Sequence, residues 1–158
     1  MVWGLVAALL LTGCVATVNR IPFPENEYAA LSKNGRSSVT GQAFLKTRAG
    51  DVKYAAGNEV WLNPATSYSD QWYTESYLGG KRPNPQNADT RLDKYLYTTQ
   101  ADGEGRFTFK NIPSGDYYCT TIITWQVAGQ YGTTATGGAV TKKILVRNGS
   151  PVEVILTR

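Results

Sequence analysis

The longest regular pattern in the sequence is an alternation of two sets of side chains along residues 117–127. One set is richer in large apolar side chains, and the other is richer in threonine and other polar side chains. A repeat of two residues is typical of a β-strand with one buried face. The pattern therefore predicts a strand whose core-facing side chains are Tyr117, Cys119, Thr121, Ile123, Trp125 and Val127.

Two clusters of turn residues precede this strand. Residues 101–105 combine glycines with Asp102 and predict a hairpin loop, because glycine tolerates positive φ and Asp can bond its own backbone. Residues 106–110 alternate polar and apolar side chains, and residues 111–116 contain the proline and glycine of a second turn. We therefore expect three consecutive strands joined by two tight turns.

Further strands are predicted on both sides of this region, at residues 38–46, 58–63, 94–98, 139–146 and 152–156. Asn148-Gly149 is a strong hairpin signal, so the last two of these strands are expected to pair across it. The Gly/Thr-rich residues 129–138 are expected to form a mobile loop. Together these elements predict an all-β fold, an antiparallel sandwich of about seven strands.

Residues 64–96 separate the second and third expected strands and contain many aromatic side chains. Ser67 or Ser69 is expected to cap a helix that ends at Gly79-Gly80. The spacing of Tyr68, Trp72, Tyr73 and Tyr77 places most of these side chains on one face of that helix. Binding sites are often carried by loops inserted on a rigid scaffold, so this short helical insertion is where function is expected.

The first residues of the chain indicate export. Residues 1–13 are uncharged and mainly apolar, as in the hydrophobic region of a secretory signal peptide. Leu11-Thr12-Gly13-Cys14 resembles the bacterial lipobox, in which the cysteine becomes the lipid-modified N-terminus. That resemblance implies a membrane anchor through lipid on Cys14, and Val15 in place of Asp favours the outer membrane of a Gram-negative bacterium. An uncleaved anchor or a buried apolar segment is the alternative.

Residues 14–37 are expected to be a tether between the lipid and the domain. Two X-Pro steps favour extended backbone there, and the end of the segment is polar. Alternatively, apolar side chains could pin the segment against the sandwich, namely Ile21, Phe23, Tyr28 and Leu31.

A motif across residues 99–118 resembles the signature of the carboxypeptidase regulatory-like domain, T-x-x-D-G-E-G-R-F-x-F-x-x-I-P-x-G-D-Y-Y. Val39-Thr40-Gly41 and the stretch from Ala56 to Leu62 are similar to the opening strands of that family. The resemblance covers residues 38–158, with residues 64–96 as an insertion. It implies a transthyretin-like, Greek-key β-sandwich and says little about activity.

Aromatic side chains give the sharpest binding hypothesis. Aromatic faces stack on sugar rings, and the transthyretin-like sandwich resembles starch-binding-like folds. A carbohydrate platform is therefore one interpretation of Trp61, Trp72, Tyr73, Tyr77 and Tyr95. The same side chains could instead form a satellite core that pins the insertion to the sheet, or a surface for docking a protein.

Catalytic chemistry has little support in the sequence. The chain has no histidine, which removes the commonest general base and metal ligand. Cys119 is expected to be an inert core residue, and the acidic pair Asp102 and Glu104 to belong to a turn rather than to a calcium site. The carboxylates of Glu75, Asp89 and Asp93 are expected on the solvated surface. We therefore predict no enzyme activity, no metal site and no cofactor.

The partners follow from these elements. The formal charge of +4 is spread along the chain, so no nucleic-acid partner is expected. The preferred hypothesis is a non-enzymatic, membrane-anchored envelope lipoprotein that acts as a structural or protein-interaction module, an accessory subunit of a cell-envelope assembly. The alternative is a lipoprotein that binds a glycan through the aromatic insertion.

Overall fold

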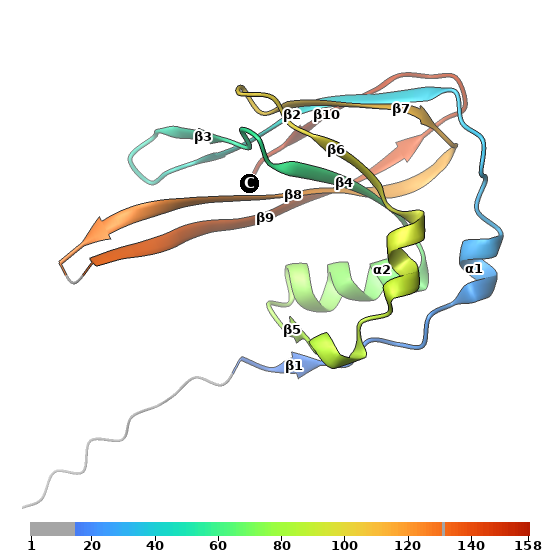
Figure 1. The fold of residues 1–158 in the computed structure, drawn as a ribbon, viewed down its shortest axis with the longest axis horizontal. Coiled ribbons are helices and arrows are strands. Elements are labelled where there is room, and N and C mark those ends of the chain that lie inside the picture. Colours follow the sequence, from blue (N-terminus) through green and yellow to red (C-terminus); the bar gives the residue numbers. More distant parts are fainter. Residues whose placement is uncertain (1–14, 131) are drawn as a thin grey trace, which may run out of the picture.

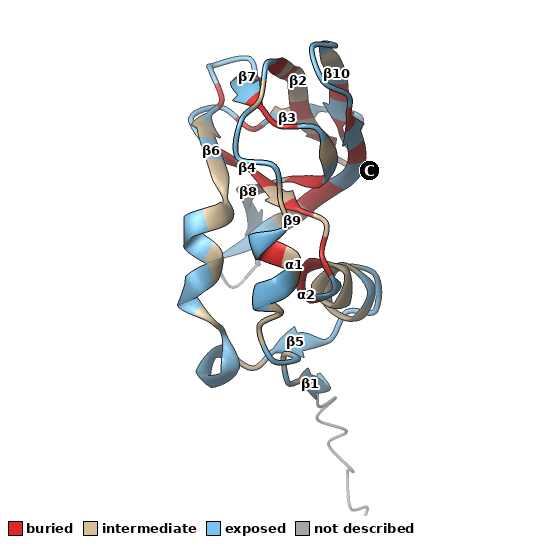
Figure 2. Cartoon of the chain, turned by 90° about the vertical axis from the view of Figure 1, so that its right-hand side faces the viewer, coloured by how far each residue is buried: buried red, intermediate tan, exposed pale blue. Residues whose placement is uncertain are grey.

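Two four-stranded sheets form the body of the molecule in the computed structural model, which describes residues 15–130 and 132–158 (Figure 1). The sheets pack face to face as a β-sandwich, and buried residues concentrate between them (Figure 2). Cys14 and residues 1–13, on which the predicted anchor and signal peptide fall, lie outside the described residues. None of the described helices has the length and apolar character needed to cross a membrane.

The first sheet is built around β2 (Ser37–Lys46). β7 (Arg106–Ile112) and β3 (Val52–Tyr54) pair with it in antiparallel fashion. β10 (Val152–Leu156) pairs with it in parallel, from Val152 opposite Val39 to Leu156 opposite Ala43. The prediction of an entirely antiparallel sandwich is therefore wrong at this pair.

The second sheet is antiparallel throughout, in the order β6 (Tyr97–Gln100), β4 (Glu59–Pro64), β8 (Gly115–Gly129) and β9 (Gly132–Val146). β8 and β9 stay paired along their whole length, so the hairpin projects beyond the sandwich (Figure 1). The mobile loop predicted at residues 129–138 is wrong, because most of that segment belongs to β9. Pairing with β8 and the β-branched threonines favour a strand there despite the glycines.

Turns lie where the sequence predicted them, but several connect different strands from those expected. Residues 101–105 lead from β6 in one sheet to β7 in the other, and residues 147–151 lead from β9 to β10 in the same way. The predicted hairpins at these two turns are therefore wrong. The turn chemistry itself is present: Asp102 accepts hydrogen bonds from the amides of Glu104 and Arg106 at 2.8 and 2.9 Å. This bonding identifies a structural role for the Asp102 carboxylate.

The buried face of β8 follows the predicted alternation for its first half. Tyr117, Cys119, Thr121 and Ile123 are all buried, which confirms their assignment to the core. Trp125 is only partly buried, and Val127 is 44% exposed, because the hairpin has left the second layer by that point. On the other face of the strand, Tyr118 is buried as well, because the insertion covers it.

The insertion begins with α2 (Ser67–Gln71), which continues as the π-helix η1 (Trp72–Leu78). Thr66 is the N-cap residue, so the predicted cap at Ser67 or Ser69 is wrong. The Thr66 hydroxyl accepts from the Ser69 amide, and the Ser69 hydroxyl accepts from the Thr66 amide, forming a capping box. After η1 follow β5 (Arg82–Pro83), the 3-10 helix η2 (Pro85–Asn87) and the 3-10 helix η3 (Thr90–Tyr95).

The N-terminal segment packs against the insertion. β1 (Thr17–Val18) pairs in parallel with β5, and α1 (Glu25–Ala29) carries Tyr28, which is 1% exposed. The Tyr28 ring stacks on Phe23 at 4.4 Å between centroids, and the Thr66 hydroxyl donates to the Tyr28 hydroxyl at 3.0 Å. Phe23 and Tyr28 therefore hold the described part of the segment against the insertion rather than against the sandwich, whereas Ile21 is exposed.

Candidate functional site

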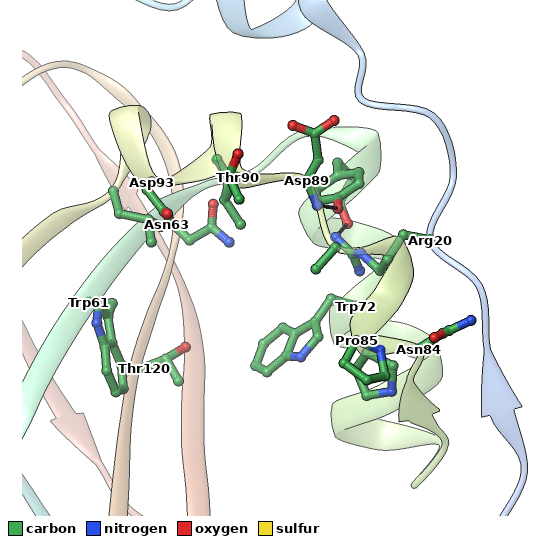
Figure 3. A pocket seen from close by; sticks show the side chains of 15 residues that line it. Arg20, Trp61, Asn63, Trp72, Asn84, Pro85, Asp89, Thr90, Asp93 and Thr120 are labelled. Atoms are coloured by element: carbon green, nitrogen blue, oxygen red, sulfur yellow. Dashed lines mark hydrogen bonds between the residues drawn. The ribbon is translucent and has the colours of Figure 1, made fainter.

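A pocket of about 440 Å³ lies between the outer face of the second sheet and the insertion (Figure 3). Side chains from four parts of the chain line it: the N-terminal segment, β4, β8 and the insertion. The aromatic, polar and charged side chains of the lining include Arg20, Trp61, Asn63, Trp72, Asp89, Asp93 and Thr120. The pocket therefore depends on the insertion being closed over the sheet.

The sheet contributes the floor of the pocket. Trp61 and Asn63 alternate with the buried Val60 and Leu62, so the period of β4 turns them to the outer face. Trp61 is paired in register with Thr120 of the neighbouring strand β8. Figure 3 shows the Trp61 and Thr120 side chains close together on the sheet. The floor is thus an indole ring beside a hydroxyl group.

The insertion contributes Trp72, which points toward the sheet (Figure 3). Its ring stacks on Tyr77 at 6.0 Å with an interplanar angle of 25°. Tyr77 in turn accepts a hydrogen bond from the backbone amide of Thr141 in β9 at 3.1 Å. Tyr77 therefore fixes the position of Trp72 relative to the sheet.

Two polar side chains of the pocket have unused hydrogen-bonding capacity. Within the described residues, Oδ1 of Asn63 and Nη1 of Arg20 are buried without a hydrogen-bond partner. The other terminal nitrogen of Arg20 donates to the carbonyl of Tyr68 at 2.5 Å, and the guanidinium lies 3.7 Å above the Tyr68 ring. Buried polar groups are nearly always paired, so these two atoms are exceptions, and both belong to residues that line the pocket.

The carboxylates at the pocket differ in their partners. Asp89 accepts hydrogen bonds from the side chain and the backbone of Arg91, which lower the pKa of its carboxyl to about 2. Its carboxylate points away from Trp72 (Figure 3). Asp93 lines the same pocket and is exposed, whereas Glu75 pairs with Lys81 at 3.2 Å outside it. Asp89 and Asp93 therefore share the pocket, whereas Glu75 lies apart from them.

The five aromatic residues predicted to bind a ligand have different roles in the structure. Trp61 and Trp72 share the pocket. Tyr73 and Tyr77 stack on each other, and Tyr73 stacks on Tyr118 at 4.6 Å, so these rings fasten the insertion to the sheet. Tyr95 packs against Tyr28 at 4.6 Å and fastens the N-terminal segment instead. The aromatic residues therefore supply both a satellite core and a pocket, and do not form one continuous platform.

Most of the residues that line the pocket were not predicted from the sequence, among them Asn63, Thr120 and Arg20. Asn63 lies two residues after Trp61 and Thr120 lies on the outward face of β8, so strand periodicity was a usable signal for both. Arg20 had no such signal, because the irregular segment around it shows no period. Its place at the pocket results from packing of the N-terminal segment against the insertion.

The remaining reactive groups lie elsewhere. Cys119 is fully buried, and burial raises the pKa of its thiol to about 12, which keeps it protonated at neutral pH. Across residues 15–130 and 132–158, no three side chains of His, Cys, Asp or Glu are grouped so that they could hold a metal ion. What the pocket offers chemically is two indole rings, amide and hydroxyl groups, an arginine, and the carboxylates of Asp89 and Asp93.

Comparison with known proteins places this two-sheet β-sandwich in a family. The crystal structure of a "putative carbohydrate binding protein", PA1324 from Pseudomonas aeruginosa, matches with a TM-score of 0.78 and 33% sequence identity. The match covers 89% of this chain and 100% of that chain. The protein therefore belongs to the same family as the Pseudomonas aeruginosa protein.

A second similar structure is BcpA, the major pilin subunit of Bacillus cereus, with a TM-score of 0.40 and 13% identity over 78% of this chain and 30% of that chain. No protein-family model matches the sequence, and no curated protein matches it.

Proposed function

We propose that this protein is a carbohydrate-binding protein and that it holds a sugar in the pocket between Trp61 and Trp72. The observation that carries the proposal is that two tryptophans from different layers line one cavity together with unpaired polar groups. The name of the Pseudomonas aeruginosa relative, which describes a carbohydrate-binding protein, supports the same function.

The composition of the pocket suits a sugar. Small-molecule pockets are mostly apolar, with a few polar groups that fix orientation, and about 440 Å³ falls in their usual range. An indole ring covers the C–H face of a pyranose, while amide, hydroxyl and guanidinium groups bond its hydroxyls. In this arrangement Asn63 and Thr120 bond hydroxyl groups of a ring that lies against Trp61.

We propose that binding is not followed by catalysis. The chain has no histidine, and the thiol of Cys119 is buried with a raised pKa. Of the two pocket carboxylates, Asp89 is engaged by Arg91, which leaves Asp93 without a second carboxylate for glycoside hydrolysis. The interaction-module hypothesis has weaker support than sugar binding, because the relative's name favours a glycan partner.

A lipid anchor on Cys14 and a location at the outer membrane belong to the same proposal. The lipobox-like Leu11-Thr12-Gly13-Cys14 supports them. The motif at residues 99–118 separately supports a sandwich of the carboxypeptidase regulatory-like type. Mass spectrometry of the protein isolated from membranes tests the anchor. A diacylglyceryl group on Cys14 is expected, and an unmodified Cys14 in the mature protein would contradict it.

A glycan microarray tests the binding function. The wild-type domain is compared with the double variant Trp61→Ala/Trp72→Ala, and Tyr54→Ala serves as the control because Tyr54 is an exposed aromatic residue outside both the pocket and the second cleft. We expect signals on a subset of neutral glycans that the double variant loses and the control retains. An array without signal, or equal signals for all three proteins, would contradict the proposal.

A further inference from the structure

A second cleft, of about 630 Å³, lies at the end of the molecule where two hairpins project beyond the core. One wall is the end of β2 and the loop after it, and the other is the hairpin of β8 and β9 (Figure 1). The carboxyl-terminal Arg158 lies between them. The cleft shares no lining residue with the pocket of Trp61 and Trp72, so it is a separate site.

All charged side chains that line this cleft are cations. They are Lys46, Arg48 and Arg158, and each of these residues is exposed. Among the described residues, the five ion pairs involve other lysines and arginines, so none of these three side chains forms a salt bridge. A cleft lined by charge of one sign concentrates ligands of the opposite sign.

The other wall presents the ring of Trp125, which lies close to a glycine of the paired strand. Gly137 and Gly138 of β9 have φ angles of 111° and 144°. A Cβ atom on Gly137 would lie 2.1 Å from the carbonyl oxygen of Ile123 and 3.0 Å from Cζ3 of Trp125, and one on Gly138 would lie 3.3 Å from Nη2 of Arg158. Gly137 is therefore required by the close approach of β8, and the indole and the guanidinium each lie near one of these two glycines.

We propose that this cleft binds an acidic saccharide, with its carboxylates on Arg48, Arg158 and Lys46 and a sugar ring against Trp125. Guanidinium groups bind carboxylates through paired hydrogen bonds, and an indole face contacts the apolar face of a sugar. A simple anion such as phosphate would leave Trp125 unused, so the combination of ring and charge favours a uronate-type sugar. The protein would then hold neutral sugar at one end and acidic sugar at the other.

Calorimetric titration with hexagalacturonate tests the proposal, using the full domain at low and at physiological ionic strength. The double variant Arg48→Gln/Arg158→Gln is compared with Lys33→Gln/Lys110→Gln, which removes the same charge from exposed residues outside the cleft. We expect at least a tenfold weaker affinity in the first variant and a change of less than twofold in the second. Trp125→Ala should weaken binding about tenfold, and the methyl-esterified hexamer should not bind.

Several results would overturn the proposal. Equal losses in both double variants would mean that only net charge matters, and equal binding of the methyl ester would mean that charge is not recognised. Unchanged affinity in Trp125→Ala, with competition by inorganic phosphate, would reduce the cleft to a simple anion site. Binding to anionic phosphatidylglycerol vesicles in place of hexagalacturonate would show that the cleft contacts a membrane surface instead of an acidic saccharide.

The variant Trp61→Ala/Trp72→Ala separates this inference from the proposed function. It should bind hexagalacturonate as tightly as the wild type while losing the neutral glycans of the array. Loss of hexagalacturonate binding in that variant alone would place the acidic sugar in the other pocket and refute the second site, leaving the first intact.

Discussion

Trp61 and Trp72 line one cavity from two different layers of the molecule, the first from the centre of a β-sheet and the second from the π-helix that covers it. Neither layer forms the cavity alone. The sheet provides a flat floor, and the insertion brings a second indole over it (Figure 3). Features that hold the insertion in place should therefore control binding as much as the residues that would touch a sugar.

Tyr77 should act as a positioning residue for Trp72. It stacks on Trp72 and accepts the Thr141 amide, but it does not line the pocket. We expect Tyr77→Phe to retain most glycan affinity and to cost about 1 kcal/mol of stability, because only the hydrogen bond is lost. Tyr77→Ala should weaken glycan binding about tenfold, because the support of Trp72 is gone. Calorimetric titration of both variants with the glycan measures the two affinities. Identical affinities would contradict the positioning role of Tyr77.

Tyr28 should be the main attachment of the N-terminal segment. Its ring is buried among Phe23, Tyr95 and the insertion. Tyr28→Ala is expected to lower the free energy of unfolding by about 3–5 kcal/mol, the usual cost of deleting a buried aromatic ring. Tyr54→Ala is the control, because Tyr54 is 44% exposed and should cost less than 1 kcal/mol. Urea denaturation followed by circular dichroism measures both, and equal losses would show that the segment is not held by this ring.

Gly41 should be required for the parallel pairing of β2 with β10. A Cβ atom there would lie 2.1 Å from the carbonyl oxygen of Val154 and 2.7 Å from the Phe107 ring. We expect Gly41→Ala to destabilise the protein by about 1–3 kcal/mol through overpacking. Gly103→Ala, in a turn with no atom within 4 Å of the added methyl group, should be neutral or slightly stabilising. A Gly41→Ala variant as stable as the wild type would contradict the close approach of these strands.

Stability should fall at alkaline pH. Burial raises the pKa of Cys119 from 9.0 to about 12, and it also raises the pKa values of Tyr28, Tyr97, Tyr117 and Tyr118 above their usual 10.0. Above pH 9 the unfolded chain therefore releases protons that the folded protein keeps, so the free energy of unfolding decreases as pH rises from about 9 toward 12. Urea denaturation at pH 7, 9 and 10.5 should show this decrease, and constant stability over that range would contradict it.

The sequence indicated the type and place of most strands, but not their pairing. Alternation along Tyr117 to Ile123 identified a core face, because burial imposes a period of two. The turns near Gly105 and Gly149 were also found from local residue preferences. Whether such a turn returns a strand to the same sheet or leads it to the opposite one depends on packing between layers, which local preference does not encode. The two misassigned hairpins both arose in this way.

The candidate site was also predictable from the sequence only in part. Trp61 and Trp72 were among the five aromatic candidates because the insertion is rich in aromatic residues. Helical spacing could not separate Trp72 from Tyr73, although the first faces the pocket and the second packs on Tyr118. That difference depends on how the π-helix lies on the sheet. Arg20 reaches the pocket from a distant part of the sequence, a contact that only the folded chain reveals.

The most direct test of the central claim is an NMR titration of a protein comprising residues 15–158, which follows the indole N–H signals of its three tryptophans, Trp61, Trp72 and Trp125. The titrant is the neutral glycan with the strongest array signal. Sugar in the proposed pocket should shift the Trp61 and Trp72 signals together, with one dissociation constant, and leave Trp125 unchanged. Saturable binding that leaves Trp61 and Trp72 unshifted would contradict the account.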